Sequence, residues 1–347
     1  MFNDRSVAIT GGTGAFGRKL VEALVSRYKT RRLVIFSRDE LKQYEMAQTY
    51  SPGKYPEMRY FIGDVRDYER VNTAFQGIDY VIHAAAIKHI AAAEYNPFET
   101  IKTNVLGTQN VIRACIECGV KRAIAISTDK AAAPINLYGA TKLCADKLFV
   151  AANSMSGGPE PKFSVVRYGS IWGSSDGVVP LFLVQKKEGL LTITDDRMTR
   201  FSICLDNAVD FTVAAFAQMN GGEIFVPRMP SYRIVDLAKA IAPEIPTTLI
   251  GMRPGERLHE TIIPLDESWH TLEFNNHYQI LPVDQWRDSA IEMLDERACP
   301  CAAEFSYCSN DNDWFLSVAE LKHMVHSNVL ATLNNSSRQW HLRIAQD

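Results

Sequence analysis

The sequence predicts an α/β protein in which a Rossmann-like, doubly wound parallel sheet is followed by a smaller C-terminal lobe. Short apolar, β-branched runs alternate with longer helical patterns through the first two thirds of the chain. These runs are continuously apolar, as expected of parallel strands covered on both faces. A glycine-rich stretch also follows the first run directly and opens a helix, which is typical of a βαβ unit.

The expected elements can be placed in order along the chain. Strands are predicted at SVAIT, LVIFS, RYFIG, DYVIHAA, RAIAIST, FSVVRYG and EIFVP. Helices are predicted near residues 15–28, 39–48, 67–76, 97–118, 136–153 and 206–220. Beyond residue 169 the pattern is less regular, because prolines punctuate shorter elements. We therefore expect one domain from residues 1–169 plus about 203–227, and a lobe from residues 170–202 and 228–347.

Composition favours a protein that acts on small molecules. The 347 residues carry a formal net charge of -3 with a pI near 6.3, so we expect no nucleic-acid or membrane partner. The chain enters a strand pattern at once and has no long apolar run, so we expect a cytoplasmic protein. The seven cysteines are scattered without metal-ligand spacing, which predicts reduced thiols and no structural metal.

The stretch TGGTGAFG, residues 10–17, has the spacing of a dinucleotide-binding turn. Its glycines, Gly11, Gly14 and Gly17, permit a tight turn, close approach of backbone to a pyrophosphate and close helix packing. A tight strand–helix turn without a ligand is the alternative reading. The position in a βαβ unit at the start of the chain favours the cofactor.

The end of the second strand indicates which cofactor is used. An NAD-preferring protein commonly carries an acid about 20 residues beyond the glycines, whereas this chain has Ser37 and Arg38. Arg38, with Lys42, could pair with a 2′-phosphate, which favours NADP. The alternative is a solvated arginine paired with Asp39 or Glu40.

Later strand ends complete the expected cofactor site. Asp64 and Val65 can meet the adenine edge, although Asp64 could instead cap the next helix; the alanines of HAAAIKH let the cofactor pass close to backbone. The full expected set is Gly11, Thr13, Gly14, Ala15, Phe16, Gly17, Ser37, Arg38, Lys42, Asp64, Val65, Ala84, Ala85, Lys88, Tyr138 and Lys142.

The stretch ISTDKAAAPINLYGATK, residues 126–142, holds the expected catalytic residues. Thr128, Asp129 and Lys130 follow the fifth strand at the sheet edge where such folds bind ligands. Tyr138 and Lys142 lie one turn apart on the next helix, where the cation favours a phenolate that can accept a hydroxyl proton. A surface Asp-Lys ion pair is the alternative, and the neighbouring Tyr-Lys pair weighs against it.

Linked motifs resemble those of the extended short-chain dehydrogenase/reductase family and, within it, the inverting UDP-N-acetylglucosamine 4,6-dehydratases of pseudaminic acid and capsular sugar synthesis. They run from about residue 5 to 326 and include SRDELKQ, HAAAIKH, NPFETIKTNVLGTQNVI, STDKAAAPINLYGATKL, DDRMTRF and GMRPGE.

The resemblance implies a redox-neutral elimination. Hydride passes from sugar C4 to NADP⁺ while Tyr138, poised by Lys142, takes the hydroxyl proton and Thr128 steadies the developing ketone. Lys130 then removes the C5 proton, Asp129 protonates the departing C6 hydroxyl, and hydride returns to C6. Reprotonation from the opposite face gives a UDP-linked 4-keto-6-deoxy-L-arabino sugar. Related retaining dTDP-glucose dehydratases carry Asp-Glu at the position of Asp129-Lys130, so Lys130 supports the inverting assignment.

The resemblance also implies the substrate contacts and an assembly. Ser170 stands where the family usually has Asn, and Ser175 where Arg is common, which leaves the exact sugar open. The expected substrate-binding residues are Lys88, Lys130, Ser170, Arg200, Arg253 and Glu256. Helices 97–118 and 136–153 build a dimer surface in the wider family, so a homo-oligomer, dimer or hexamer, is expected.

Three other functions compete with this interpretation. A nucleotide-sugar 4-epimerase needs the Tyr-Lys pair but no acid–base pair to eliminate water. A 4,6-dehydratase could act on a different nucleotide sugar. A non-catalytic NADP-sensing regulator would be expected to lose Tyr138 or Lys142, and both are present. Residues 285–303 and the C-terminal tail receive no functional assignment.

Overall fold

The computed structural model describes residues 1–155, 157–172, 177–283 and 298–330. Two compact units divide the chain. The larger unit comprises Met1–Tyr168, Val209–Arg228 and Ile262–Ser306, and the smaller comprises Gly169–Ala208, Met229–Thr261 and Tyr307–Asp347. Residues 262–306 were expected in the smaller lobe but group with the larger unit, because strands of this segment extend its sheet.

The larger unit is built on a ten-stranded sheet in the order β16-β14-β15-β10-β6-β5-β4-β1-β2-β3. The neighbours from β3 to β10 pair in parallel, which confirms the predicted doubly wound sheet. These strands are β1 (Ser6–Thr10), β2 (Arg32–Ser37), β3 (Met58–Ile62), β4 (Tyr80–His83), β5 (Arg122–Thr128), β6 (Lys162–Tyr168) and β10 (Ile224–Pro227). The strand order reverses between β1 and β4, where such sheets bind ligands.

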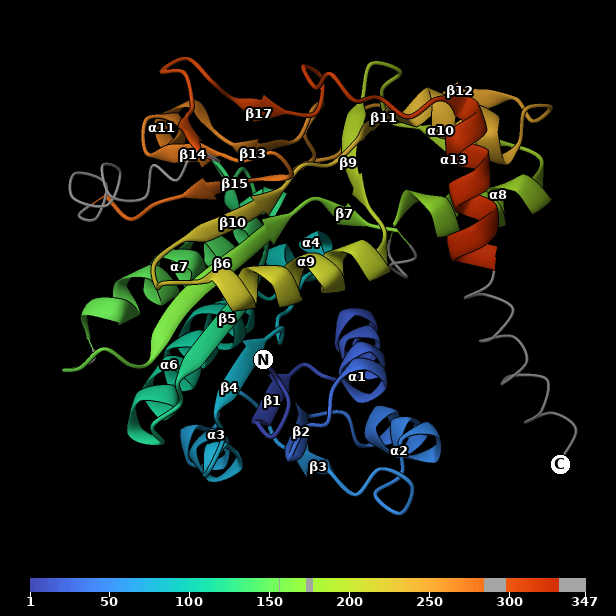
Figure 1. Cartoon of the computed structure of the whole chain (residues 1–347). Coiled ribbons are helices and arrows are strands. Elements are labelled where there is room, and N and C mark those ends of the chain that lie inside the picture. The colour runs from blue at the N-terminus through green and yellow to red at the C-terminus, as the bar shows by residue number, and fades with distance from the viewer. Residues whose placement is uncertain (156, 173–176, 284–297, 331–347) are drawn as a thin grey trace, which may run out of the picture. The chain divides into compact units, whose positions relative to one another are not determined.

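Helices cover both faces of this sheet, as continuously apolar strands require. Val7, Ala8 and Ile9 of β1 are all fully buried. In Figure 1, α1 and α2 lie on one face and α3, α6 and α7 on the other. The helices are α1 (Ala15–Arg27), α2 (Glu40–Thr49), α3 (Tyr68–Phe75), α4 (Ile90–Tyr95), α5 (Pro97–Ile101), α6 (Gly107–Glu117), α7 (Leu137–Ala151), α9 (Leu205–Gln218) and α11 (Leu265–Ser268).

Three antiparallel strands extend the sheet beyond β10. Strands β15 (His277–Ile280), β14 (Thr271–Glu273) and β16 (Cys299–Pro300) follow one another outward. The sequence predicted only the parallel strands, because these segments are short and mix polar with apolar residues. All four residues of β15 are nevertheless buried.

The predicted helix over 97–118 is interrupted by a π-helical turn, Lys102–Leu106. Gly107 begins α6 at the end of this turn, where a Cβ atom would lie 2.7 Å from Val65 Cγ2. Asn104 in the turn accepts from Ile87 N at 2.8 Å and donates to Ile87 O at 2.9 Å. The turn therefore aims Asn104 at the segment after β4. Such turns often occur at functional sites.

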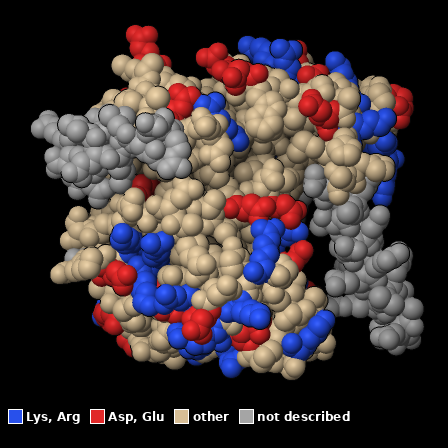
Figure 2. Space-filling model, viewed as in Figure 1, with Lys and Arg blue, Asp and Glu red and all other residues tan. Residues whose placement is uncertain are grey.

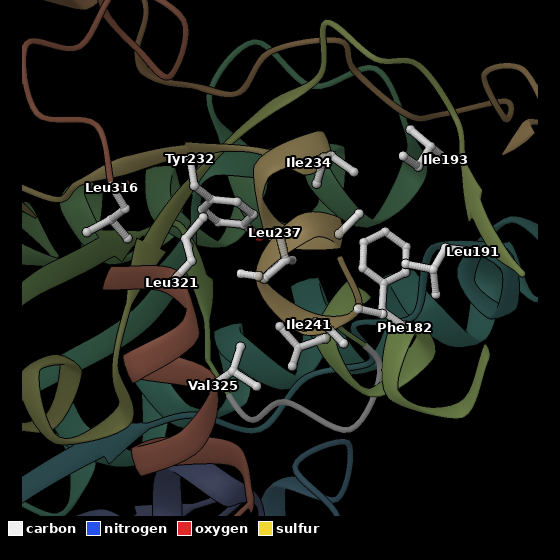
Figure 3. Packing of buried hydrophobic residues seen from close by; sticks show 14 of the residues in the cluster. Phe182, Leu191, Ile193, Tyr232, Ile234, Leu237, Ile241, Leu316, Leu321 and Val325 are labelled. Carbon is white, nitrogen blue, oxygen red and sulfur yellow. The ribbon is translucent and has the colours of Figure 1, made fainter. Parts of the chain in front are cut away.

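The smaller unit has its own core around α10 (Ile234–Ile241). Ile234, Leu237, Ala238 and Ile241 are buried at the i, i+3, i+4, i+7 spacing of one helix face. Figure 3 shows apolar side chains of α8, α10 and α13 meeting around Leu237. The other elements are α8 (Val178–Glu188), α13 (Val318–Met324), a sheet of β7 (Ser170–Ile171), β9 (Thr199–Ile203) and β11 (Ser231–Arg233), and a pair β8 (Leu191–Ile193) and β12 (Thr247–Leu249).

The surface of the larger unit carries mixed charge. Figure 2 shows Lys and Arg side chains interspersed with Asp and Glu on the displayed face. Arg66, for example, pairs with Asp64 at 2.8 Å and with Glu99 at 2.5 Å. Within the described part of the chain, no helix combines the length and apolar character needed to cross a bilayer.

Candidate active site

The carboxyl end of β5 brings three of the expected catalytic side chains together. Thr128 ends β5 and caps a short 3₁₀ turn, Asp129–Ala131. Its hydroxyl donates to Asp129 Oδ1 at 2.8 Å, and Lys130 Nζ donates to the same oxygen at 3.1 Å. Asp129 is 1% exposed, and its Oδ2 has no hydrogen-bond partner among the described residues. The turn thus holds a buried carboxyl group in contact with an amine.

The first turn of α7 packs tightly against this 3₁₀ turn. Asn136 caps α7 by accepting from Gly139 N at 2.8 Å. A Cβ atom at Gly139 would lie 2.2 Å from Lys130 O, so only glycine allows this approach. The close packing fixes Tyr138, next to Gly139, near the Thr128–Lys130 turn.

Tyr138 is electrostatically linked to that turn. Burial raises the pKa of its phenol to about 12, and Lys130 and a hydrogen bond with the Thr128 side chain act in the opposite direction. A contact path therefore runs from Tyr138 through Thr128 to Asp129 and Lys130. In the protein without ligands the phenol is protonated at neutral pH.

Lys142 lies one helical turn further along α7 and is 4% exposed. Its ammonium donates to Ile126 O in β5 at 2.8 Å. Burial lowers the pKa of Lys142, while Asp146 opposes that change. The structure therefore brings Thr128, Asp129, Lys130, Tyr138 and Lys142 to one edge of the sheet, where the sequence placed them.

The glycine-rich turn after β1 fits a dinucleotide phosphate. Gly11 has φ of +67°, and a Cβ atom there would lie 2.8 Å from Ala85 Cα, so the turn lies directly against the backbone after β4. Gly14 is the N-cap of α1 and supplies no side-chain cap, and the first turn of α1 has no acidic residue. The N–H groups at this helix end are thus left for an anion.

Gly17 is expected to tolerate no side chain. A Cβ atom there would lie 2.5 Å from Gly12 Cα and O, which are backbone atoms that cannot rotate away. We expect Gly17→Ala to lower the free energy of unfolding by about 1–3 kcal/mol, measured by urea denaturation. Gly53→Ala is the matched control because nothing lies within 4 Å of its Cβ position. Equal stability of the two variants would show that the turn is loose.

The end of β2 carries the residues expected to determine whether NADP or NAD is bound. Ser37 Oγ lies 2.8 Å from Thr13 Oγ1, which ties it to the glycine-rich turn. The Arg38 side chain is 61% exposed and lies 3.9 Å from Asp64 Oδ2. Lys42 instead pairs with Asp39 at 3.1 Å. The Asp64 carboxylate accepts hydrogen bonds from the Arg66 backbone N–H at 2.9 Å and from the Arg66 guanidinium at 2.8 Å. These bonds form a local turn.

The segment after β4 lies beside the glycine-rich turn. Ala84 N donates to Thr10 O at 3.1 Å and Ala85 N to Thr10 Oγ1 at 3.3 Å. His83 is 2% exposed at the end of β4, and burial lowers its pKa to about 3. Lys88 is exposed in this segment. Val65 is buried, and Ala15 and Phe16 begin α1.

The smaller unit holds the other residues expected to contact substrate. Ser170 begins β7 and pairs with Ser202 of β9. The Arg200 guanidinium donates to the carbonyl oxygens of Thr199, Leu258 and Arg257, at 2.6, 3.1 and 3.0 Å.

Arg253 and Glu256 form their own turn, in which Arg253 N donates to Glu256 Oε2 at 3.1 Å. Their side chains approach at 3.9 Å, and the Arg253 side chain is 58% exposed. Ser175 lies outside the described residues, as do residues 285–297 of the unassigned 285–303 segment and all of the tail after residue 330.

Sequence reasoning missed several buried polar groups beside this site. Asp146 and Arg167 are both 0% exposed, and Tyr168 is 3% exposed with no hydrogen-bond partner for its hydroxyl among the described residues. Two features of the sequence could have revealed them: an arginine inside the apolar strand FSVVRYG, and an acid one turn beyond Lys142. A charged residue in a buried element needs a partner of opposite charge.

Comparison with known proteins identifies the family. Residues 7–282 match the profile of a family described as "Polysaccharide biosynthesis protein". The chain belongs to the polysaccharide biosynthesis protein family. The parallel sheet, the glycine-rich turn and the Tyr138–Lys142 helix all lie within the matched residues.

Family members similar to this chain include enzymes that act on nucleotide sugars. A Campylobacter jejuni protein named UDP-N-acetylglucosamine 4,6-dehydratase (inverting) is 51% identical over 94% of this chain and 98% of its own length. The X-ray structure of Pen from Bacillus thuringiensis is 36% identical, with a TM-score of 0.85 and coverage of 94% and 98% of the two chains. A Rickettsia rickettsii protein named UDP-glucose 4-epimerase is 40% identical over 82% of this chain and 84% of its own. The resemblance noted from the motifs is confirmed.

The His, Cys, Asp and Glu side chains bear on whether the chain holds a metal ion or a disulfide. Within the described ranges, no three or more His, Cys, Asp or Glu side chains cluster as they would around a metal ion. Each of the seven cysteines is a free thiol.

Proposed function

We propose that this protein is an NADP-dependent UDP-N-acetylglucosamine 4,6-dehydratase that inverts C5. Its product would be UDP-2-acetamido-2,6-dideoxy-β-L-arabino-hex-4-ulose, for bacterial surface-sugar synthesis. The observation that carries the proposal is the contact between Lys130 Nζ and Asp129 Oδ1 at 3.1 Å, beside Tyr138. The 51% identity to a named inverting dehydratase supports the same substrate.

Tyr138 serves as the base for the C4 hydroxyl. A phenol with a pKa of about 12 needs nearby positive charge to become a phenolate. Lys130 already acts in this direction, and Lys142, one turn along the same helix face, would add to it. Thr128 contacts both Tyr138 and Asp129, so its hydroxyl can steady the C4 oxygen as the ketone forms.

Asp129 and Lys130 eliminate water as a pair. Elimination needs a base to take the C5 proton and an acid to protonate the C6 hydroxyl, and a neutral amine with a carboxylic acid meets both needs. Moving one proton across their contact, from Lys130 Nζ to Asp129 Oδ1, converts an ion pair into that combination. Asp129 is 1% exposed, so its carboxyl group is shielded from water during this transfer.

The larger unit would hold NADP through the glycine-rich turn, Ser37 and Arg38. When bound, the nicotinamide accepts hydride from the sugar and gives it back. The uncapped N-terminus of α1 would bind the diphosphate, and the exposed Arg38 guanidinium would bind the 2′-phosphate.

Arg38→Ala should shift the preference from NADP toward NAD. Losing a charged contact to the 2′-phosphate is expected to weaken NADP⁺ binding roughly 10- to 100-fold, from about 1.5–3 kcal/mol, and to leave NAD⁺ binding nearly unchanged. Isothermal titration with both cofactors measures this. Arg59→Ala is the matched control. Arg59 lies on the neighbouring strand β3, is exposed, and donates to Pro56 O and Met58 O. An equal loss for NAD⁺ would contradict the role given to Arg38.

Among the arginines of the smaller unit, Arg253 is the better candidate for the UDP diphosphate. Its side chain is largely exposed, whereas Arg200 donates to backbone carbonyls and holds the local fold. Glu256 would then orient Arg253 and meet the ribose or uracil. Ser170 and Lys88 stay predicted sugar contacts.

Incubation with UDP-N-acetylglucosamine in deuterated water tests the proposal. Loss of water with one deuterium at C5 and an arabino product is expected. An unchanged mass would favour the 4-epimerase, an activity named for relatives that are 40% identical. Retained configuration at C5 would overturn the role of Lys130. UDP-glucose and other nucleotide sugars, run in parallel, test what Ser170 changes.

The location and the assembly of the protein stay predictions. We place the reaction in the cytoplasm, where nucleotide sugars are made, and we expect a homo-oligomer, dimer or hexamer. Size-exclusion chromatography with light scattering measures the assembly.

A further inference from the structure

Two side-chain hydrogen bonds connect α7 to β5 next to the candidate active site. Lys142 Nζ donates to Ile126 O at 2.8 Å, and Ser127 Oγ donates to Asp146 Oδ2 at 2.8 Å. Lys142 and Asp146 are four residues apart on α7, so their side chains share one face of the helix. Adjacent residues of β5 therefore hold a buried cation and a buried carboxyl group next to each other.

A buried arginine anchors Asp146 from the other side. Arg167 of β6 is fully buried and donates to Glu267 Oε2 at 2.6 Å, to Ile262 O at 3.1 Å and to Asp146 Oδ2 at 3.4 Å. Glu267 belongs to α11, from the segment that returns to the larger unit. Burial raises the pKa of the Asp146 carboxyl, and Arg167, Lys142 and the Ser127 hydrogen bond limit that rise.

We propose that Asp146 is a positioning residue for Lys142. The buried carboxylate of Asp146 supplies the counter-charge that keeps the ammonium at Ile126 O, one helical turn along from Tyr138, and Arg167 and Glu267 hold this carboxylate in place. The assignment deepens the proposed function, because the charge of Asp146 opposes the lowering of the Lys142 pKa by burial. Asp146 Oδ1 is buried and has no hydrogen-bond partner among the described residues. A network serving only to join α7 to the sheet would not need a full charge next to Lys142.

Other titratable groups are coupled to this pair, directly or through Tyr138, and the test must separate them from Asp146. They are His83 of β4, Asp129 and Lys130 of the 3₁₀ turn, Tyr138 of α7, Arg167 and Tyr168 of β6, and Glu267 of α11. His83 stays neutral because burial lowers its pKa to about 3. It therefore does not titrate with Lys142.

The direct test follows the titration of Lys142 by NMR of protein carrying ¹³C-labelled lysine, with no cofactor or substrate. The resonance is identified by its absence in Lys142→Met. Asp146→Asn keeps the shape and an acceptor for Ser127 but removes the charge, so the midpoint of Lys142 is expected about one pH unit lower, a tenfold change in protonation. Ser127→Ala removes one hydrogen bond and no charge, and is expected to leave the midpoint nearly in place.

An unchanged midpoint in Asp146→Asn would overturn the proposal. If that variant does not fold, Asp146→Ser, which removes the same charge, decides: a lower midpoint supports the proposal, and an unchanged midpoint refutes it. Activity provides a second readout, in which the alkaline limb of kcat should move to lower pH in Asp146→Asn. A wild-type protein that fails to dehydrate the sugar would refute the proposed function, while the NMR titration would still report on Asp146.

Discussion

Lys130→Ala is expected to abolish loss of water while leaving cofactor binding intact. The amine proposed to take the C5 proton is gone, and general-base contributions are typically about 10²- to 10⁴-fold. Oxidation at C4 should survive, because Tyr138 and Lys142 are retained. Reduced nicotinamide should therefore accumulate in the absorbance trace, and the sugar recovered from deuterated water should carry no deuterium at C5.

Lys130→Arg separates a base from a mere positive charge. A guanidinium keeps the charge near Asp129 but is not deprotonated in proteins. If Lys130 acts as a neutral amine, the arginine variant should be as inactive as the alanine variant. Substantial elimination by Lys130→Arg would mean that the residue works by charge alone, and another group would have to remove the C5 proton.

Tyr138→Phe should stop the reaction one step earlier. Without the phenol no group accepts the C4 hydroxyl proton, so we expect turnover to fall by about 10²- to 10⁴-fold. In contrast to Lys130→Ala, neither reduced nicotinamide nor C5 exchange should appear. Because the pKa of Tyr138 is about 12 without ligand, the wild-type rate should rise with pH on the acid side of its optimum.

Tyr60→Phe is the matched control for the tyrosine change. Burial raises the pKa of Tyr60 to about 12 as well, and its hydroxyl donates to Tyr50 O at 2.8 Å, away from the β5 edge. We expect this variant to turn over normally. Accumulation of reduced nicotinamide by Tyr138→Phe would show that a different base serves C4.

Local signals were enough to predict the parallel half of the fold and the grouping of the catalytic residues. Continuously apolar runs mark buried strands, and the ends of neighbouring parallel strands meet at one edge, so Thr128 and the glycine-rich turn could be placed there. The spacing of Tyr138 and Lys142 fixed their common helix face.

Features that depend on contacts between distant residues could not be predicted. Strands β14, β15 and β16 are recognisable as strands only through their partners, and their sequence alone has no clear period. The π-helical turn at Lys102–Leu106 depends on packing near Val65 and Ile87. The partner of Arg167 lies 100 residues further along the chain, beyond any local pattern.

The return of residues 262–306 to the larger unit has a consequence for how the protein is made. Strand β16, which completes the sheet, ends at residue 300, after the ribosome has already synthesised most of the smaller unit. Until Glu267 emerges, the Arg167 charge on β6 lacks its closest carboxylate. The larger unit therefore cannot complete its sheet until this late segment has been synthesised.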